Sequence, residues 1–552
     1  MNNIDIVKKK FGVVYTPERL ADFVSELLLI EANKESVSIN NVLDPSCGEG
    51  ALLDAMKRNE KFCGNLHGID IDELVISLLK EKNDYNLIHN NVIMPKGIKN
   101  TAEEYWINKL PSLDAIVANP PWSTYKAYNR ETLEKAGYSI SAHYNDIYTL
   151  FVELSIKILS KNGLAAFILP DSIFEAHSTK IREFLAEQTS IKIIARLGEK
   201  IFKEVNRATT VIIVQKKKPE KDSRTTCFRL NTDARNDYLK SNKPLIDFYV
   251  NNNHSIYQKR FTLNEDYTFD IDTREEEEYL ISKIKKDKID FNSRFVFGRG
   301  VEISKKGKVI TCPYCNIAQG FTKTQLEVGK KTCSACKNDF ILKRDDVKTL
   351  ITNEIKNVTN NNTEKIFVGE NIKRYRITGH SYVKLDVNGI NYKNKHMYTP
   401  PKILIRKTGL GIYSCVDYSH NYTTQTVYIL KQKGYSDIPL EYYIALLNSR
   451  VVYYFYLKVY GENEWKSHPY LTKKIIYSLP IKKYEKNQLT DEIVKIASQL
   501  AKEYNYQKDI ELEEAIMEWY NLSKFEKRMI IQEMNKLPEL GAVKQMKVDL
   551  DV

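Results

Sequence analysis

The stretch "VLDPSCGEGALL", from Val42 to Leu53, sets a short apolar run before an aspartate, a Gly-x-Gly turn and a second apolar segment. This order predicts a strand that ends at Asp44, followed by a tight turn and a helix. In doubly wound α/β folds, ligands bind at the carboxyl ends of the strands beside this first turn. Gly48 and Gly50 would let the backbone approach such a ligand closely. The third glycine of the dinucleotide fingerprint is missing, so a plain turn remains an alternative to a ligand loop.

Strand-like and helix-like segments alternate on both sides of this stretch, over residues 1–215. Helices are expected at "PERLADFVSELLLIEA" (17–32) and "DIYTLFVELSIKILSKNG" (146–163), and strands at "LDAIVANPP" (113–121) and "LAAFILP" (164–170). Alternating strands and helices predict a parallel sheet that helices cover on both faces. The expected fold class is therefore α/β, with a Rossmann-like sheet.

Size and composition limit the remaining choices. A chain of 552 residues is too long for one core, which favours two or three domains. Its 83 basic and 71 acidic residues give a net charge of +12, which indicates a polyanionic partner only weakly, because a solvated lysine-rich surface would give the same value. No apolar run reaches the roughly 18 residues of a membrane span. The N-terminus shows no signal-peptide pattern, so we expect a cytoplasmic protein and no membrane partner.

Two further segments add candidate residues to the ligand site that we expect in a crevice at the carboxyl ends of these strands. The segment "HGIDID" ends a predicted strand at Asp70, where a carboxylate can accept both hydroxyls of a ribose. The alternative for an acid in this segment is a helix N-cap, a role that suits Asp72 better. The segment "LIHNNVI" follows, and its turn near Asn91 can hold an adenine ring. Together the segments predict a site for a nucleoside-containing cofactor.

The segment "NPPW", Asn119 to Trp122, follows a predicted strand at the same crevice. Proline fixes the backbone, so the carbonyl of Pro120 and the side-chain oxygen of Asn119 can face one point. Two acceptors at that point would bind one amino group, shift its nitrogen toward a tetrahedral form and aim its lone pair outward. Trp122 offers a ring on which a heterocycle can stack. The alternative is a rigid proline turn with a core tryptophan.

In combination, these motifs resemble the gamma class of adenine-N6 DNA methyltransferases, the TaqI-like amino-methyltransferases of restriction–modification systems. The resemblance covers residues 11–215 in the family's motif order. It is carried by "GVVYTPERLADFV", "LDPSCGEG", "NPPW" and "NDIYTLFVELSIKILSKNGLAAFILPDSIF". It implies a sheet that binds S-adenosylmethionine, and direct methyl transfer to the N6 of an adenine that is flipped out of the duplex.

The resemblance also implies roles for individual residues. Asp70 takes the ribose of the cofactor, and the turn at Asn91 takes its adenine. The catalytic segment is Asn119, Pro120, Pro121 and Trp122; Trp122 stacks on the target base, and Phe202 is the second aromatic that contacts it. The implied cofactor-binding residues are Val14, Thr16, Asp44, Ser46, Cys47, Gly48, Gly50, Asp70, Ile71, Asn91, Asn119 and Pro121. Two positions depart from the family, which commonly has aspartate at Asn91 and tyrosine or phenylalanine at Trp122.

Four of the eight cysteines form two Cys-x2-Cys pairs: Cys312 with Cys315, and Cys333 with Cys336. Two such pairs suit one tetrahedral Zn²⁺, and four thiolates leave no open position for catalysis. We therefore predict a structural zinc ribbon over residues 309–340. Free thiols or a redox pair are the alternatives.

The second half of the chain carries basic segments interleaved with aromatics, "GENIKRYRITGHSY" and "YTPPKILIRKTGLG". We expect them to bind DNA, with Arg374 and Arg406 as candidate contacts, although a solvated charged face remains the alternative. The segments "YYIALLNSRVVYYFYLKVYGE" and "HPYLTKKIIYSLPI" resemble the C-terminal specificity domain of the same methyltransferases. The expected domains are a catalytic domain at 1–245 and a mixed α/β target-recognition domain at 250–552, which ends in helices over 487–540.

Several functions remain open at this point. An RNA adenine methyltransferase, a methyltransferase of release-factor glutamine, a catalytically silent DNA-binding module and a fused restriction enzyme are the alternatives. The last is disfavoured because no separate nuclease region is recognisable. We expect double-stranded DNA as the partner and a monomeric chain, and leave a cognate restriction endonuclease open.

Overall fold

The computed structural model describes residues 16–122, 128–140, 146–202, 207–304, 306–353, 362–461, 470–539 and 543–548. The chain divides into two compact units, Met1–Glu277 with Lys458–Ser467, and Glu278–Leu457 with His468–Val552. This division lies later than the expected domain limits at 245 and 250. The functional limits of the domains remain a prediction.

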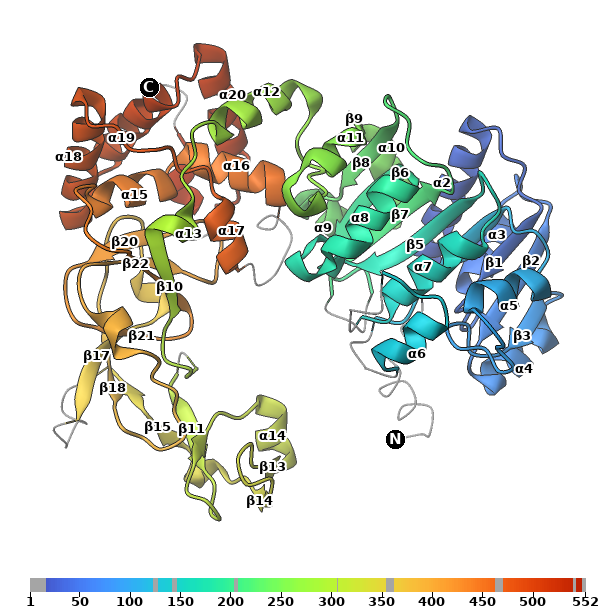
Figure 1. Ribbon diagram of the computed structural model, residues 1–552, viewed down its shortest axis with the longest axis horizontal. Helices are drawn as coiled ribbons and strands as arrows, with labels where there is room; N and C mark the ends of the chain where they lie inside the picture. The colour runs from blue at the N-terminus through green and yellow to red at the C-terminus, as the bar shows by residue number, and fades with distance from the viewer. Residues whose placement is uncertain are drawn as a thin grey trace. The chain divides into compact units, whose positions relative to one another are not determined.

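The first unit alternates helices and strands along the chain (Figure 1). Its elements are α2 Glu18–Lys34, β1 Asn41–Asp44, α3 Ala51–Arg58, β2 Asn65–Asp70, α4 Glu73–Lys82, β3 Asn86–His89, α5 Ala102–Lys109, β4 Ala115–Ala118, α6 Arg130–Lys135, α7 Tyr148–Ile158, β5 Leu164–Pro170, α8 Thr179–Gln188, β6 Ser190–Gly198, β7 Thr209–Gln215, β8 Arg224–Arg229, α9 Thr232–Lys240, α10 Leu245–Asn252, β9 His254–Tyr257 and α11 Lys259–Leu263. Helix α12, Glu275–Lys285, crosses into the second unit.

The strands of the first unit form one sheet in the order β3-β2-β1-β4-β5-β7-β6-β8-β9. Strands β3, β2, β1, β4 and β5 are parallel to one another. The order reverses direction between β1 and β4, so the crevice at the carboxyl ends of these two strands is the expected ligand site of an open α/β sheet. The mixed α/β fold is thus confirmed. The expectation of a wholly parallel sheet is wrong, because β7 runs antiparallel between β5 and β6.

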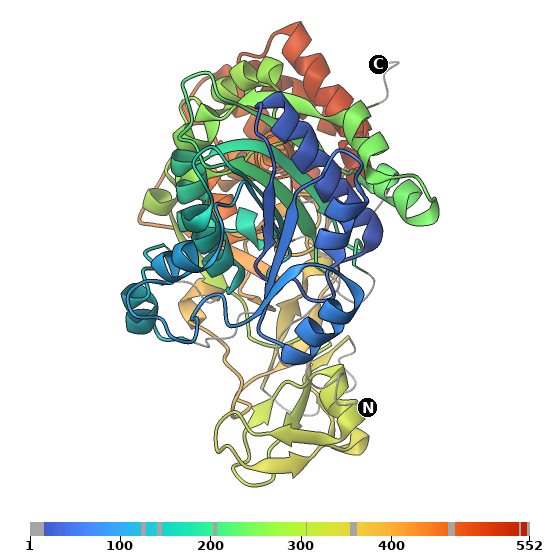
Figure 2. The same cartoon turned by 90° about the vertical axis from the view of Figure 1, so that its right-hand side faces the viewer.

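The sheet is buried on both faces because adjacent residues of its strands alternate between two apolar layers. Val42 belongs to the apolar layer that also contains residues of α2, α3 and α10, whereas Leu43 belongs to the layer that contains residues of α5, α7 and α8. Figures 1 and 2 show α2 and α7 on opposite sides of the sheet. Helix α2 begins directly after Pro17, so the proline is the N-cap residue and lies one position before the first turn in which the sequence predicted it. This three-layer core fixes the strand ends that carry the candidate site.

The second unit contains several small sheets and a group of helices (Figure 1). Its elements are α13 Phe291–Arg294, β10 Phe295–Arg299, β11 Lys308–Thr311, β12 Ala318–Gln319, α14 Lys323–Val328, β13 Lys330–Thr332, β14 Asp339–Ile341, β15 Lys348–Thr349, β16 Ile351–Thr352, β17 Thr363–Phe367, β18 Ser381–Lys384, β19 Lys402–Arg406, β20 Ser414–Asp417, β21 Tyr422–Thr423, β22 Val427–Gln432, α15 Leu440–Leu447, α16 Arg450–Tyr460, α17 Lys473–Ser478, α18 Gln488–Lys502, α19 Tyr506–Trp519 and α20 Lys524–Asn535.

Two four-stranded sheets, β10-β22-β19-β20 and β16-β18-β17-β21, share one apolar core in the second unit. The helices α18, α19 and α20 follow, as the amphipathic pattern from residue 487 predicts. The Leu-Asn-Ser segment has a structural role here, because the side-chain amide of Asn448 pairs with both backbone groups of Ser414 on β20. Among the described residues, no helix combines the length and apolar character that crossing a membrane requires.

Candidate functional site

The turn after β1 brings the first predicted motif to the crevice. Gly48 and Gly50 both adopt positive φ, at +49° and +89°, and a Cβ on Gly50 would lie 2.9 Å from the side chain of Leu79. A side chain at Gly50 would be strained by this φ and would require the end of the Leu79 side chain to shift. A Cβ on Gly48 would meet nothing within 4 Å. Gly50 thus serves packing, whereas Gly48 borders open space that a ligand can enter.

Asp70 ties the second motif to this turn. Its carboxylate accepts hydrogen bonds from the backbone N–H groups of Gly48, at 2.8 Å, and Asp72, at 2.9 Å. Asp72 instead caps α4, with its side chain 3.0 Å from the backbone nitrogen of Leu74, as predicted. Each oxygen of Asp70 keeps capacity for a second donor. Ile71 beside it is 58% exposed, so an apolar surface lies next to the carboxylate.

Two acids at this edge of the sheet, the buried Asp44 and the half-buried Asp70, have raised pKa values. Burial raises the pKa of Asp44 to about 8, and the nearby Asp70 raises it further, although the N–H of Ser46 opposes the shift. Burial also raises the pKa of Asp70. In the described part of the chain, neither acid has an ion-pair partner. Cys47 is buried between these segments, and burial likewise raises the pKa of its thiol.

Three separate motifs meet at Asn119. The amide nitrogen of Asn119 lies 3.0 Å from the hydroxyl of Thr16, and the hydroxyl of Ser46 lies 3.4 Å from the backbone carbonyl oxygen of Asn119. Asn119 directly follows β4, so these bonds join the N-terminal motif and the turn after β1 to the proline segment. Pro120 is buried and Pro121 half-buried. Val14, the remaining N-terminal candidate, lies outside the described residues.

Trp122 and Phe202 are packed against one another. Their ring centroids are 5.2 Å apart at an interplanar angle of 80°, an edge-to-face contact. The pairing brings together the two aromatics that the sequence singled out. However, Trp122 is 7% exposed and Phe202 2% exposed, so neither presents an open stacking face. The indole nitrogen of Trp122 lies 3.4 Å from the carbonyl oxygen of Ile168, and Arg207 donates to the carbonyl of Trp122 at 2.6 Å.

Asn91 follows β3, and its side chain already forms hydrogen bonds with Ile93, Met94 and Tyr128. The side-chain oxygen accepts from the N–H groups of Ile93 and Met94 at 3.0 and 3.1 Å. The amide nitrogen donates to the hydroxyl of Tyr128 at 2.6 Å. Because the oxygen is doubly engaged, Asn91 has one N–H left to offer a ligand and no unused acceptor.

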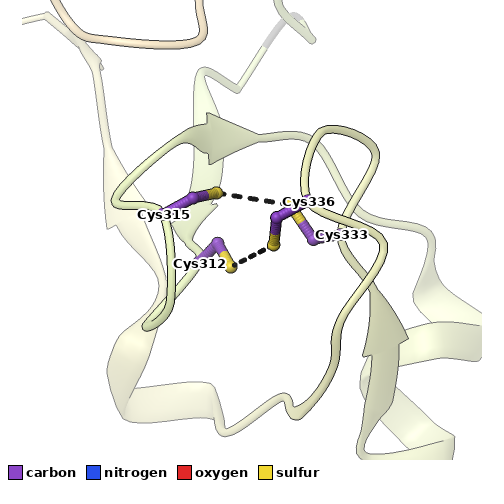
Figure 3. Close-up of side chains that lie close together, drawn as sticks. All are labelled: Cys312, Cys315, Cys333 and Cys336. Atoms are coloured by element: carbon purple, nitrogen blue, oxygen red, sulfur yellow. Dashed lines mark hydrogen bonds between the residues drawn. The ribbon is translucent and has the colours of Figure 1, made fainter.

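The four paired cysteines converge at one point in the second unit (Figure 3). Their sulfur atoms all lie within 4.8 Å of one another, with Cys312–Cys336 at 3.7 Å and Cys315–Cys333 at 3.6 Å. A disulfide requires about 2.05 Å. A tetrahedron with Zn–S bonds of about 2.3 Å has sulfur–sulfur edges of about 3.8 Å, which is close to both distances. The arrangement fits a four-thiolate metal site.

The two cysteine pairs have the same local geometry. In each, the residue after the second cysteine has positive φ: Asn316 at +57° and Lys337 at +64°. Its backbone nitrogen bonds back to the carbonyl of the first cysteine, at 2.9 and 3.1 Å. Backbone N–H groups of Cys336 and Ala335 and the amide of Gln319 lower the pKa of Cys333, against the opposing effect of burial. Two matched knuckles therefore present their sulfurs to one centre.

The structure corrects the expectation for Arg374. Its side chain is fully buried, and its two terminal nitrogens lie 2.7 and 2.9 Å from the oxygens of Asp509. Arg450 joins the same carboxylate at 3.2 Å. Arg374 therefore lies in a buried ion-pair network that links the 364–481 region to α19, and its guanidinium cannot reach DNA in this state. Arg406 is half-buried at the end of β19, where its guanidinium carbon lies 5.6 Å from the ring centroid of Tyr413.

A cluster of cations and aromatics that the sequence reasoning missed lies near Arg406 in the second unit. Lys407 lies 5.8 and 5.9 Å from the ring centroids of Tyr428 and Tyr470. Lys473 lies 5.6 Å from the ring of Phe297 and 5.1 Å from that of Tyr477. Burial, and the charge of nearby Arg299, lower the pKa of Lys407. Within the described ranges, Arg299, Lys407 and Lys473 have no carboxylate partner. In the sequence, only the adjacent cations Arg406 and Lys407 pointed to this cluster.

Comparisons with known proteins match both halves of the chain. A family described as "N-6 DNA Methylase" matches residues 2–293, more than half of the chain, and a "TaqI-like C-terminal specificity domain" matches residues 364–481. The type II methyltransferase M.VspI of Vibrio sp. (strain 343) is 29% identical over 229 residues, which cover 41% of this chain and 53% of that protein. The type II methyltransferase M.AccI of Acinetobacter calcoaceticus is 26% identical over 213 residues, 37% of each chain.

The chain thus spans about half the length of the first of these relatives and less of the second. Among solved structures, a type I restriction–modification methyltransferase subunit from Streptococcus thermophilus superimposes with a TM-score of 0.37 and 18% identity, covering 49% of this chain and 61% of that one. The type IIG restriction endonuclease BpuSI gives a TM-score of 0.42 at 14% identity, with 94% of this chain and 68% of that one covered.

Proposed function

The chain belongs to the N-6 DNA methylase family, and from this premise we propose that it methylates the N6 amino group of adenine in duplex DNA, with S-adenosylmethionine as donor. The observation that carries the proposal is the meeting of Thr16, Ser46 and Asn119, each from a different motif, at the ends of β1 and β4. A plain proline turn would not require this convergence. The specificity-domain match at residues 364–481 supports DNA as the acceptor.

The crevice suits the cofactor by charge and by shape. S-adenosylmethionine supplies an electrophilic methyl group on a sulfonium centre, together with a ribose diol and an ammonium group. In our proposal, the two ribose hydroxyls donate to Asp70, and the open space at Gly48 admits the ligand next to the backbone. Burial raises the pKa of Asp44 to about 8, so a positively charged ligand nearby would favour the ionised form of this acid and be stabilised by it in turn. Ser46 and Cys47 belong to this turn, Thr16 is linked to it through Asn119, and Val14 lies two residues before Thr16 in the sequence.

The adenine of the cofactor would lie beside Ile71 and Asn91. The exposed side chain of Ile71 offers an apolar surface for one face of the ring. Because the oxygen of Asn91 is engaged by two backbone N–H groups, we propose that Asn91 donates its remaining N–H to a ring nitrogen. The aspartate common in the family would instead accept from the amino group of that adenine.

Asn119 and Pro120 would act on the target amino group. Their oxygens accept its two N–H bonds, which draws the nitrogen lone pair out of the aromatic system and toward the donor. S-adenosylmethionine held at Asp70 and the turn after β1 would supply the methyl group to this nitrogen and leave as S-adenosylhomocysteine, and the proton lost from the nitrogen would pass to water. The bond from the Asn119 amide to Thr16 turns the amide oxygen away from Thr16, which fixes the orientation of the acceptor.

Trp122 and Phe202 would contact the flipped base, with Pro121 behind them. Since both rings are buried in edge-to-face contact, the base has to separate or shift them as it enters. Flipping costs a few kcal/mol, and contacts elsewhere on the duplex must offset it. We propose that Arg299, Lys407 and Lys473, with Arg406 nearby, supply part of those contacts. Lys407 and Lys473 lie over aromatic rings, an arrangement that suits phosphates and exposed bases, and Arg299 lies close to Lys407.

We further propose one structural Zn²⁺ bound by Cys312, Cys315, Cys333 and Cys336. The sulfur distances support it, and so does the small core beneath the knuckles, in which the buried residues are Ile310, Cys312, Cys333, Phe340 and Leu342. A core of this size needs an additional constraint to remain folded. Metal analysis of protein purified without chelator should give one zinc per chain. A value near zero with an unchanged melting curve would reject the site.

The activity itself is tested with labelled S-adenosylmethionine and two acceptors, mixed-sequence duplex DNA and RNA. We expect labelled N6-methyl-2′-deoxyadenosine after hydrolysis of the DNA to nucleosides. Label confined to cytosine, RNA or protein would contradict the proposal. A cognate restriction endonuclease as partner is suggested by the type II and type I relatives, and a search for cleavage that this methylation blocks would test it.

A further inference from the structure

Residues 306–353, here called the four-cysteine module, fall between the two family matches, which end at 293 and resume at 364. The module comprises strands β11 to β16, helix α14 and both cysteine knuckles. Neither matched family therefore assigns it a role. The small core beneath its knuckles is distinct from the core of the two four-stranded sheets, to which the module contributes the buried residues Val309, Ala318, Leu350 and Ile351.

The module is held firmly against the matched specificity segment. The backbone nitrogen of Ala318 donates to the carbonyl of Asn388 at 2.8 Å. Gly389 adopts φ +94°, and a Cβ there would lie 2.4 Å from both the carbonyl oxygen of Ala318 and the side chain of Ile317. Only glycine permits this approach. The module is therefore a fixed extension of the specificity segment at the first knuckle.

The surface of the module is strongly basic. It holds nine lysine or arginine residues and four acidic ones in 48 residues, a net charge of +5, whereas the whole chain carries +12 in 552. Two lysines are neutralised, Lys323 by Glu327 at 3.7 Å and Lys330 by Asp339 at 2.9 Å. Within the described residues, no carboxylate lies within ion-pair distance of the others, which are Lys306, Lys308, Lys331, Lys337, Lys343, Arg344 and Lys348.

We propose that the four-cysteine module binds the phosphate backbone of duplex DNA beyond the bases that the specificity domain reads. The inference rests on the proposed function, which makes DNA the substrate. Seven unneutralised cations on a fixed support match a polyanion, and phosphate contacts position a protein without reading sequence. Tyr314, 65% exposed between the ligands of the first knuckle, can stack on or pack against the same partner. The module would therefore raise affinity for all sequences and leave the recognised site unchanged.

The test compares two double variants of the full chain that remove the same charge. Lys337→Gln with Lys348→Gln removes two unpaired cations, and Lys323→Gln with Lys330→Gln, the matched control, removes two paired ones. Binding to a mixed-sequence duplex is measured across salt concentrations, and zinc content verifies that the knuckles remain intact. We expect the test pair to lower the slope of log affinity against log salt by about 1.8 and to weaken binding on the order of tenfold, with the same methylated sequence. The control should change the slope by less than about 0.5.

The outcomes separate this inference from the proposed function. The inference would be overturned if wild type and test variant gave the same slope of log affinity against log salt, or if test and control variants lost the same affinity. Methylation of DNA by the wild type would stand in either case. A changed recognition sequence would also overturn it, because the module would then read bases. If wild type methylates no DNA, the proposed function fails. If it binds RNA or a protein through these lysines, and duplex DNA is unaffected, the module has a different partner and the inference fails.

Discussion

Two buried acids, Asp44 in the first unit and Asp509 in the second, have opposite surroundings. At the carboxyl end of β1, burial raises the pKa of Asp44 to about 8, and the nearby Asp70 adds to the shift. In α19, burial alone would raise the pKa of Asp509, but Arg374 and Arg450 outweigh it and hold the pKa below its ordinary value. A buried charge is stable only when it is paired and hydrogen-bonded. The first unit therefore holds acids that a ligand can compensate, and the second holds an acid that the protein has compensated itself.

The largest expected effect comes from breaking the compensated network. Arg374→Ala should lower the free energy of unfolding by about 3–5 kcal/mol, because it leaves Asp509 buried with part of its counter-charge removed. Arg406→Ala, the matched control at a half-buried position, should change it by less than about 1 kcal/mol. Urea denaturation of both variants measures this. A stable Arg374→Ala protein that has lost only DNA affinity would restore the DNA-contact role and refute the network.

At the site in the first unit, Asn119→Ala should lower methyl transfer on the order of 10²-fold or more, since it removes an acceptor used mainly in the transition state. Cofactor affinity should change only a few-fold. Asn100→Ala, at an exposed position in the same unit, should leave both quantities unchanged. Single-turnover kinetics and a direct cofactor titration separate the two effects. Near-normal turnover in Asn119→Ala would show that the role assigned to this amide is wrong.

The pH dependence of stability tests the uncompensated acids. Because the folded pKa of Asp44 lies above its unfolded value near 4, the folded state binds the extra proton, and stability falls as pH rises from about 4 to about 8. The slope is at most about 1.4 kcal/mol per pH unit for one proton. Asp44→Asn should flatten this loss, and saturating cofactor should reduce it in wild type. Thermal melts at several pH values provide the measurement; parallel pH profiles for both proteins would contradict the assignment.

The smallest effect is expected at the cation–aromatic cluster. Lys407→Gln should weaken binding to duplex DNA several-fold and lower the salt slope by about 0.9, the value for one phosphate contact. Lys536→Gln, which removes a lysine paired with Glu533 at 3.0 Å, serves as the control. Fluorescence anisotropy at several salt concentrations resolves the difference. If the two variants weaken binding equally, Lys407 makes no specific contact.

The sequence predicted the parts of the first unit that depend on local chemistry. Pro17 and Asp72 lie at helix starts, and the apolar runs of β1 and β4 form buried strands. The direction of β7 was not predictable in this way, because a fully buried strand has the same apolar composition whichever way it runs. The meeting of Thr16, Ser46 and Asn119 was implied by the family's motif order and not by any local pattern.

Burial of charge and of aromatic rings limited the prediction elsewhere. The partner of Arg374 is Asp509, 135 residues further along the chain, so a basic segment could not reveal that its arginine faces inward. The double engagement of the Asn91 oxygen depends on the turn that follows it, and the edge-to-face packing of Trp122 depends on Phe202. The cysteine pairs were easier, because the ligand spacing of a metal knuckle is itself a sequence property.

The central claim is that the site at the carboxyl ends of β1 and β4, where Asp44 and Asp70 have no ion-pair partner in the described residues, transfers methyl groups to adenine. The most direct measurement is expression in a host without adenine methylation, followed by base-resolved sequencing of the genomic DNA. The account predicts N6-methyladenine at one recurring sequence with the wild-type chain, and none with Asn119→Ala. Unmethylated adenine with the wild-type chain, or methylation that survives Asn119→Ala, would contradict it.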